Sequence, residues 1–588
     1  MAKSQHSMEA STKNTHYPKR DPVGFEDNHV QTAQVLPMNE VPENEALIPR
    51  NSTDRIFFID LADRQLKTIS PEVFSLEHLE ELHMERNLIV NIPKEINLLR
   101  NMKVLYLDHN RIQNICEELG KMKSILSLDL SYNPLSYSSL LVISNLQSLR
   151  QLRLYQIKLD EIPVQICKHL YHIELLGLSD NNLQCLPKET VNLKNLKEIF
   201  LKNNRFENFP TVLCKIVTLE IIDLEQNLIS HIPEEIGSLT NLVKLFLAFN
   251  NLSSIPPTLR HCQKLAVLDL SHNPLHKLPP DLKNFTKKRE LSLAGNSPEE
   301  LPAQTGAWTS LTHVYLRNTG LRTVHRSFTK LTSVRVLDLS ENCFDEIPKG
   351  ICSMKNLEVL NLDDNQIQEI PAEIQELTNL KCLSLSKNQF NIFPVEVFLV
   401  ESLEKLYLGQ NKGIKLKSLP GDITKLQNLK ELHIDNNRLE YLPPAVGSLT
   451  HLKILDCHNN LLKELPESLS QIQGLQKLLV QNNQLSKLPG NLDNLKQLQV
   501  ILVDGNPMTD PPTEVCSQGT SAILQYLQQK RFKKAKASKI RNMWRGLITK
   551  KGIGPLLAMK DMDNKKKEKK GKEKGKQKKP GKEAKAKK

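Results

Sequence analysis

Histidines, cysteines and carboxylates are the side chains of this chain that could do chemistry, and their spacing decides whether they converge on one point. His433 and His458 lie in adjacent segments of a repeating pattern, with Asp435 and Asp456 close by, so the two pairs could approach each other. The other histidines and carboxylates are scattered, and there is no GxxxxGK[ST] phosphate loop, GxSxG elbow, HExxH pair or GxGxxG turn. We therefore predict no enzymatic activity and no small-molecule substrate, and we interpret the four residues as ordinary polar side chains.

The cysteines follow the repeating pattern. Four of the ten share one column of it: Cys167, Cys214, Cys352 and Cys516. The closest two members of that column are two repeats apart, which at about 4.8 Å per stacked strand separates them by roughly 10 Å, too far for a disulfide. There is no CxxC motif, and Cys343 with Cys352 lacks a second pair of ligands, so no metal or cofactor site is predicted. Reduced thiols of a cytoplasmic protein are expected.

The elements that position these side chains are short repeats. The pattern LxxLxLxxNxLxxIPxxIxxLxx recurs every 23 residues, with starts at 56, 79, 102 and onward to 498, giving twenty units with slight changes of length. One such unit cannot bury its own apolar face and needs a neighbour on each side. The predicted fold is therefore an α/β solenoid, a horseshoe of about 20 repeats over residues 53–518.

Each position of a unit has a physical task. In the unit that starts at 219, Ile222 and Leu224 should point inward from a short parallel strand, while Asp223 and Glu225 should point onto the concave face. Asn227 should turn the chain and bond its otherwise unpaired backbone groups. Three units lack this asparagine, and their turns are expected to be less well satisfied; the replacements are Arg64, Ile157 and Thr319.

On these motifs the array resembles the 23-residue leucine-rich repeats of intracellular proteins, the type found in Ras-pathway scaffolds, over residues 56 to about 520. With its C-terminal segment, the chain resembles the leucine-rich repeat and IQ domain-containing proteins. The resemblance implies a non-enzymatic protein-protein interaction scaffold in intracellular signalling. It does not imply a particular partner, because unrelated functions share this fold.

A protein partner should bind the concave strand positions, whose side chains the repeat does not need for its core. Exposed aromatic side chains are the commonest material of interaction hot spots. The predicted partner surface consists of Tyr155, Phe200, Phe246, Phe249 and Tyr315. The alternative is that these aromatics merely suit a strand.

The segment 519–552 is predicted to be helical, because Gly519 precedes it, Gly552 ends it, and no glycine but Gly546 and no proline lies between. Thr520 is the expected N-cap. A first apolar group should cover the open end of the solenoid: Ile523, Leu524 and Leu527.

The end of this helix, KIRNMWRGLITKKG at residues 539–552, is basic and has an apolar stripe. It resembles a degenerate IQ motif, IQxxxRGxxxR, with Arg541 where glutamine is expected and Lys550 for the last arginine. Calmodulin or a calmodulin-like light chain is the partner that this resemblance implies. The predicted calmodulin-binding residues are Ile540, Met543, Trp544, Arg545, Gly546, Leu547, Ile548 and Lys550. The alternative is a longer cap folded back on the array.

Both ends are predicted to be disordered. Residues 1–52 are polar, without the apolar region of a signal peptide, and residues 553–588 form a lysine-rich tail. Residues 530–588 hold 25 Lys or Arg against 5 Asp or Glu, which accounts for the net charge of +13. Such a tail could bind an anionic surface or direct the protein to the nucleus. The alternative function is therefore a polycation-anchored structural protein of a microtubule, membrane or nucleic-acid surface, with a passive repeat array.

Overall fold

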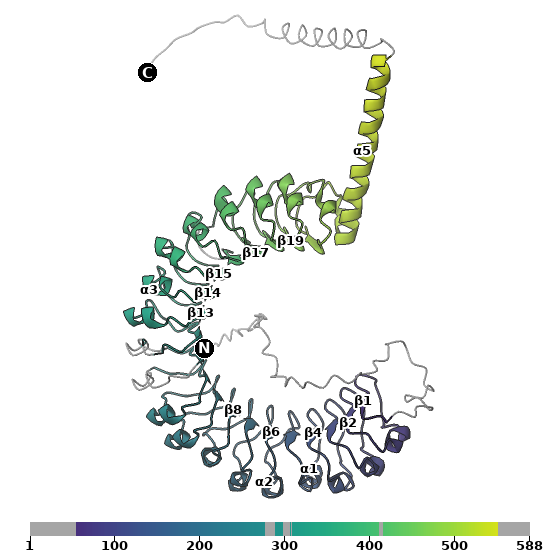
Figure 1. Cartoon of the computed structure of the whole chain (residues 1–588), viewed down its shortest axis with the longest axis vertical. Coiled ribbons are helices and arrows are strands. Elements are labelled where there is room, and N and C mark those ends of the chain that lie inside the picture. The colour runs from purple at the N-terminus through teal and green to yellow at the C-terminus, as the bar shows by residue number, and fades with distance from the viewer. Residues whose placement is uncertain are drawn as a thin grey trace, which may run out of the picture.

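The computed structural model describes residues 55–276, 289–297, 301, 306, 308–410 and 415–550, with the side chains of 546–550 left out. The predictions for residues 1–52 and for the tail after 552 lie outside the described residues. The repeats form an open arc, with strands along its inner edge and short helices along its outer edge (Figure 1). A long helix, α5, leaves the last repeat and extends away from the arc. The predicted leucine-rich repeat solenoid is confirmed.

The inner edge is one parallel sheet of 20 strands, in which each strand pairs with the strand of the next repeat. The register is constant, so the middle residues pair with one another, as Ile222 does with Leu245. The strands are β1 (Phe58–Asp60), β2 (Glu81–His83), β3 (Val104–Tyr106), β4 (Ser127–Asp129), β5 (Gln151–Arg153), β6 (Leu175–Gly177), β7 (Glu198–Phe200), β8 (Ile221–Asp223), β9 (Lys244–Phe246), β10 (Val267–Asp269), β11 (Glu290–Ser292), β12 (His313–Tyr315), β13 (Val336–Asp338), β14 (Val359–Asn361), β15 (Cys382–Ser384), β16 (Lys405–Tyr407), β17 (Glu431–His433), β18 (Ile454–Asp456), β19 (Lys477–Leu479) and β20 (Val500–Leu502).

Along the outer edge, the described part of the chain carries a short helical turn in nearly every repeat, and most of these turns follow a proline such as Pro233. Proline fixes an extended approach to the turn and has no N–H to leave unpaired. The 3-10 turns are η1 (Pro71–Ser75), η2 (Lys94–Leu98), η3 (Leu119–Lys121), η4 (Lys188–Asn192), η5 (Thr211–Lys215), η6 (Glu234–Ser238), η7 (Pro257–His261), η10 (Arg326–Lys330), η11 (Ala372–Glu376), η12 (Val395–Leu399), η13 (Gly421–Lys425), η14 (Pro444–Ser448), η15 (Glu467–Gln471) and η16 (Leu492–Asn494). The α-helices are α1 (Tyr137–Ile143), α2 (Val164–His169), α3 (Lys349–Cys352), α4 (Thr513–Cys516) and α5 (Thr520–Lys550).

One continuous apolar core runs between the sheet and these turns. Ile222 and Leu224 are fully buried, as the strand alternation predicts, while Asp223 and Glu225 remain partly exposed on the other face. Four phenylalanine side chains at intervals along the array are fully buried in this core: Phe206, Phe328, Phe344 and Phe390. The ten cysteine thiols, which follow the same repeat, are all free.

The turn asparagines form the predicted ladder. Asn227 is only 5% exposed, and its Nδ2 donates to the carbonyl oxygens of Leu201 at 3.0 Å and Leu224 at 3.1 Å. Its Oδ1 accepts the N–H of Phe206, 3.1 Å away in the preceding repeat. Asn250, one repeat later, donates to the same Leu224 carbonyl at 2.9 Å. Each amide therefore bonds two repeats together while it satisfies a tight turn.

The three turns without this asparagine are better satisfied than predicted. In each, the asparagine of the following repeat accepts two backbone N–H groups instead of one. The distances from Asn181 Oδ1 to the nitrogens of Ile157 and Leu159 are 3.1 and 3.0 Å, and Asn87 and Asn342 do the same for the turns of Arg64 and Thr319. The prediction that these turns are less well satisfied is therefore wrong for their N–H groups, because the next repeat supplies the acceptor.

The C-terminal end of the sheet is covered by the start of α5. Ile523 is fully buried, Leu527 is 2% exposed, and Leu524 packs against the same core, as predicted. Thr520 is not the N-cap: it lies within α5, and its hydroxyl accepts the N–H of Ile501 at 2.9 Å, on the free edge of β20. This side chain therefore caps the sheet instead of the helix. Among the described residues, no helix is long and apolar enough to cross a bilayer.

Candidate protein-interaction surfaces

The concave face is formed by the first and third residues of each strand and by the residues that follow it. Carboxylates and aromatic or histidine side chains make up most of the third-residue row. Its aspartates include Asp129, Asp223, Asp269, Asp338 and Asp456, and its rings include His83, Tyr106, Phe200, Phe246, Tyr315, Tyr407 and His433. The face therefore offers ring surface and carboxylates side by side.

The five predicted aromatic residues do not form one contiguous patch. Phe200 and Phe246 occupy the same row of the sheet, but the strand register places Asp223 between them. Two further strands, with Asp269 and Ser292 in that row, separate Phe246 from Tyr315. Their assignment as a partner surface stays a prediction, and the structure presents it as separate rings spaced along the arc.

Tyr155 lies flat against the sheet. A Cβ atom built on Gly177 would come within 2.6 Å of the Tyr155 hydroxyl, so the ring occupies the space that the glycine leaves. Burial raises the pKa of the Tyr155 hydroxyl to about 12. This ring therefore packs against the array more than it projects from it.

Phe249 is the most exposed of the five, at 50%. Its ring stacks on His272 with centroids 4.1 Å apart, and the His272 ring in turn lies over Gly295. Burial lowers the pKa of His272, which favours the neutral ring. The Phe249 backbone has a φ of 55°, in the left-handed region that a bulky residue rarely adopts. Nearly every described repeat has a left-handed residue at this position, so the conformation belongs to the repeat, and the exposed ring is what distinguishes Phe249.

The sequence reasoning missed an equivalent stack near the N-terminal end. His109 and Tyr132 occupy the same position of their repeats as Phe249 and His272, with φ values of 53° and 55° and centroids 3.9 Å apart. The available signal was a ring directly before the turn asparagine in two successive repeats.

A second missed row crosses the first three strands. The His83 ring lies 5.2 Å from Phe58 and 4.8 Å from Tyr106, measured between centroids. Burial lowers the pKa of His83, but hydrogen bonds to Glu85 and Glu81 outweigh it and raise that pKa above its usual value.

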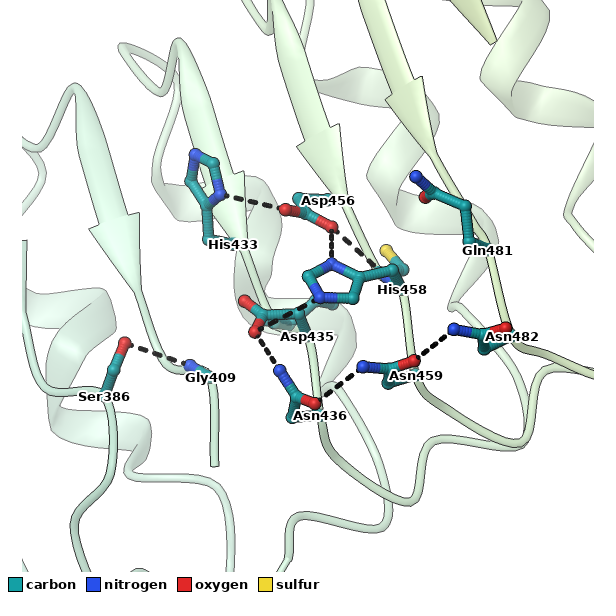
Figure 2. A network of polar contacts seen from close by, with 12 residues as sticks. Ser386, Gly409, His433, Asp435, Asn436, Asp456, His458, Asn459, Gln481 and Asn482 are labelled. Carbon is teal, nitrogen blue, oxygen red and sulfur yellow. Dashed lines mark hydrogen bonds and ion pairs between the residues drawn. The ribbon is translucent and has the colours of Figure 1, made fainter. Parts of the chain in front are cut away.

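Buried carboxylates extend along the middle of the face. Asp363 Oδ1 accepts from the Ser384 hydroxyl at 2.6 Å and from the Ser386 N–H at 2.7 Å. Burial raises the pKa of Asp363 to about 6, and it also raises the pKa of Asp338. Farther along, His433 and His458 both contact Asp456, so the structure brings together the two histidines that the repeat spacing placed in adjacent units (Figure 2).

The basic part of α5 extends beyond the array, and its described side chains are exposed. Ile540 is 46% exposed, Met543 and Trp544 are each 61% exposed, and Phe532 is 62% exposed. Arg545 is also exposed, whereas Gly546, Leu547, Ile548 and Lys550 belong to α5 with side chains outside the described part. Only the beginning of α5 contacts the repeats, near η16, α4 and β20 (Figure 1). The alternative of a helix folded back on the array does not describe this structure.

Two family models match the chain. The one described as a leucine-rich repeat region matches residues 325–437, and the one described as leucine rich repeat matches residues 59–112, 100–156, 217–275 and 427–485. Together with the repeating sheet and its asparagine ladder, these matches identify the repeat type. The chain is an array of leucine-rich repeats.

Two curated relatives of this leucine-rich repeat protein carry the name that its C-terminal segment suggested. Leucine-rich repeat and IQ domain-containing protein 4 of Homo sapiens is 54% identical over 170 residues, which is 29% of this chain and 30% of the relative. The Mus musculus protein of the same name is 55% identical over 166 residues, 28% of each chain. The match spans less than a third of these relatives, so their activities as whole proteins are proposals here.

Solved structures resemble the leucine-rich repeat array in fold. The ectodomain of the Arabidopsis thaliana receptor kinase GASSHO1/SCHENGEN3 matches with a TM-score of 0.54 at 27% identity, over 78% of this chain and 59% of that one. A TDR receptor matches with a TM-score of 0.52 at 20% identity, over 74% of this chain and 86% of the receptor, which shows the fold alone.

Proposed function

We propose that this leucine-rich repeat protein is a non-enzymatic scaffold of the cytoplasm with two docking elements. Its concave face binds a protein segment, and the free end of α5 recruits calmodulin or a calmodulin-like light chain. The single observation that carries the proposal is the exposure of α5: Ile540, Met543 and Trp544 face solvent on a basic helix that only its first turns attach to the array. Apolar side chains left in water beside cations suit a partner that supplies both pockets and carboxylates.

Support for the concave docking element comes from ring geometry. Phe249 on His272 and Tyr132 on His109 form two matching stacks on the same column of the repeat, with the exposed rings held in the left-handed region. The core does not require these rings, since most other repeats place asparagine, aspartate or other polar residues at that position. The left-handed backbone is common to the repeats, so it is the choice of exposed rings at this position that supports partner docking.

The free thiols along the array are consistent with the proposed cytoplasmic location. Residues 532–545 add exposed positive charge next to the lysine-rich tail, which keeps an anionic surface as the competing partner. In the scaffold, most of the binding affinity comes from the concave face, whereas in a tail-anchored structural protein it comes from the lysine-rich tail. Electrostatic attachment through the tail weakens steeply with salt, whereas an apolar concave contact persists.

The test is capture of binding proteins from cell extract on the immobilised full chain at low and high salt. The Phe200→Ala, Phe246→Ala double variant should lose the salt-resistant partners, and a chain ending at Gly552 should keep them. Ile392→Ala is the matched control, because Ile392 is 79% exposed but lies outside the strands. Binding that depends only on the tail and disappears in high salt would contradict the scaffold proposal.

A further inference from the structure

Two histidines and two aspartates from neighbouring repeats converge on the concave face near its C-terminal end (Figure 2). The parallel register places His433 of β17 directly opposite Asp456 of β18. Asp435 and His458 each follow two residues after these, where the chain leaves the strand. The distance from His433 Nδ1 to Asp456 Oδ2 is 3.4 Å, and the distance from His458 Nε2 to Asp435 Oδ2 is 3.9 Å.

Three of these side chains each place a possible metal-ligand atom in one small region. The available ligand atoms of His433, Asp435 and Asp456 all lie within 4.8 Å of one another. Nitrogen and oxygen ligands that bind one Zn²⁺ tetrahedrally at 2.0 to 2.2 Å are about 3.3 to 3.6 Å apart. The His433–Asp456 pair already has that separation, and small side-chain rotations bring Asp435 into it.

Charge and burial also favour a cation here. Asp456 is 7% exposed, and its described polar partners are histidines and its own backbone neighbourhood. Asp435 Oδ2 accepts a hydrogen bond from Asn436 Nδ2 at 2.5 Å. Lys405, on the neighbouring strand, is already paired with Glu431 at 2.8 Å. Two carboxylates therefore share this position with no lysine or arginine among their described contacts, and a divalent ion would balance them.

The surroundings orient the ligands. The His433 ring stacks on Tyr407 with centroids 4.5 Å apart, and the Tyr407 hydroxyl donates to Glu431 Oε2 at 2.9 Å. That same carboxylate oxygen is 3.8 Å from His433 Nε2, which is buried and has no hydrogen-bond partner among the described residues. A metal-binding histidine almost always donates its other ring N–H to a carboxylate, a backbone carbonyl or a water. Glu431 is the carboxylate near His433 Nε2, within reach of a small side-chain rotation.

Asp456 is held in the same way. His458 Nδ1 lies 2.6 Å from Asp456 Oδ1, the carboxylate oxygen that does not face His433. Beneath Asp435, Gly409 leaves the space that its carboxylate fills: a Cβ there would be 2.7 Å from Asp435 Oδ1. These contacts fix both carboxylates in place.

We propose that His433, Asp435 and Asp456 bind a divalent transition-metal ion, with Zn²⁺ the best match, while His458 orients Asp456. The mixed imidazole and carboxylate set selects against Ca²⁺ and Mg²⁺, which prefer oxygen ligands alone. Three protein ligands leave one position of a tetrahedral ion open toward the concave face, where water or a partner side chain can occupy it. No short sequence motif indicates this site, because two successive repeats supply its ligands.

The test is a titration of the full chain, reduced and stripped of metal, with Zn²⁺ in competition with a chromophoric chelator. Wild type should bind one Zn²⁺ that His433→Gln and Asp435→Asn each weaken at least about tenfold, and His458→Gln should weaken it by a similar factor through Asp456. His83→Gln is the matched control, because His83 lies between Glu81 and Glu85 on the same face yet outside the proposed ligand set. Co²⁺ bound at the site should show ligand-field bands without a thiolate charge-transfer band.

Melting of the metal-free variants distinguishes lost ligands from lost folding. His433→Gln and Asp435→Asn should melt as metal-free wild type does, while added Zn²⁺ should raise the melting temperature of wild type and of His83→Gln only. Equal Zn²⁺ affinity in wild type, His433→Gln and Asp435→Asn would overturn the proposal, as would a thiolate band in the Co²⁺ spectrum.

Discussion

At the scale of single residues, the buried asparagine of each turn does more than end a strand. Its amide contacts backbone groups of its own repeat and of the preceding one, as Asn227 does with Leu224 and Leu201. Removing Asn227 leaves the buried N–H of Phe206 without its acceptor, and the Leu201 and Leu224 carbonyls keep only the donors that Asn204 and Asn250 supply. An unpaired buried N–H costs more than the hydrogen bond itself contributes.

Asn227→Ala should therefore lower the stability of the array by about 1 to 3 kcal/mol. The control is Asn379→Ala, because Asn379 is an exposed asparagine whose one hydrogen bond goes to the Lys355 carbonyl at 2.8 Å. Thermal unfolding followed by circular dichroism compares the two. Equal melting temperatures would contradict the role of the ladder.

Asp363 gives the concave face a pH dependence. Burial raises its pKa to about 6, so the folded state favours the neutral acid. This contribution to stability is complete below the pKa of the unfolded chain, about 4, and is lost as the pH rises through about 6.

Asp363→Asn should remove that dependence, because an asparagine oxygen can still accept from Ser384 and Ser386. Between pH 4 and pH 7, the stability of wild type relative to the variant should fall by about 1 to 3 kcal/mol. Denaturant unfolding at both pH values measures the difference. A constant difference between the two proteins would exclude a shifted carboxyl group at this position.

At the scale of elements, the sequence predicts features that follow from the spacing of apolar residues within a repeat. It misses features that depend on contacts between elements of the folded chain. The strands, the inward residues such as Ile222 and the buried cap residue Ile523 follow from the spacing of apolar side chains. Thr520 was expected to cap its own helix but bonds Ile501 of β20, because the free sheet edge lies within reach only once the chain has folded.

Contacts between repeats are also missed, because they form only when the repeats stack. Asn181 satisfies the turn at Ile157 from the next repeat, and the Phe249–His272 stack joins rings of two successive repeats. The predicted aromatic surface named suitable side chains, but only the strand register shows that Asp223 lies between Phe200 and Phe246. Composition identifies candidates for binding, and register decides which of them touch.

At the scale of the whole molecule, the arc and its projecting helix separate two kinds of recognition. The array holds rings and carboxylates in fixed positions along the concave face, while α5 carries an exposed basic and apolar surface away from it (Figure 1). A partner on α5 therefore need not compete for space with a partner on the repeats. The proposed function depends most on α5 acting as a docking helix for a calmodulin-type protein.

Tryptophan fluorescence of the full chain tests that claim most directly. Trp308 is 3% exposed and Trp544 is 61% exposed, so a change of environment on binding should come from Trp544. Added calmodulin should shift the emission to the blue, more strongly with calcium than with chelator, because calcium opens the apolar groove and Arg541 replaces the glutamine of the IQ pattern. Trp544→Phe should abolish the shift. Unchanged emission at micromolar calmodulin, both with calcium and with chelator, would contradict the account.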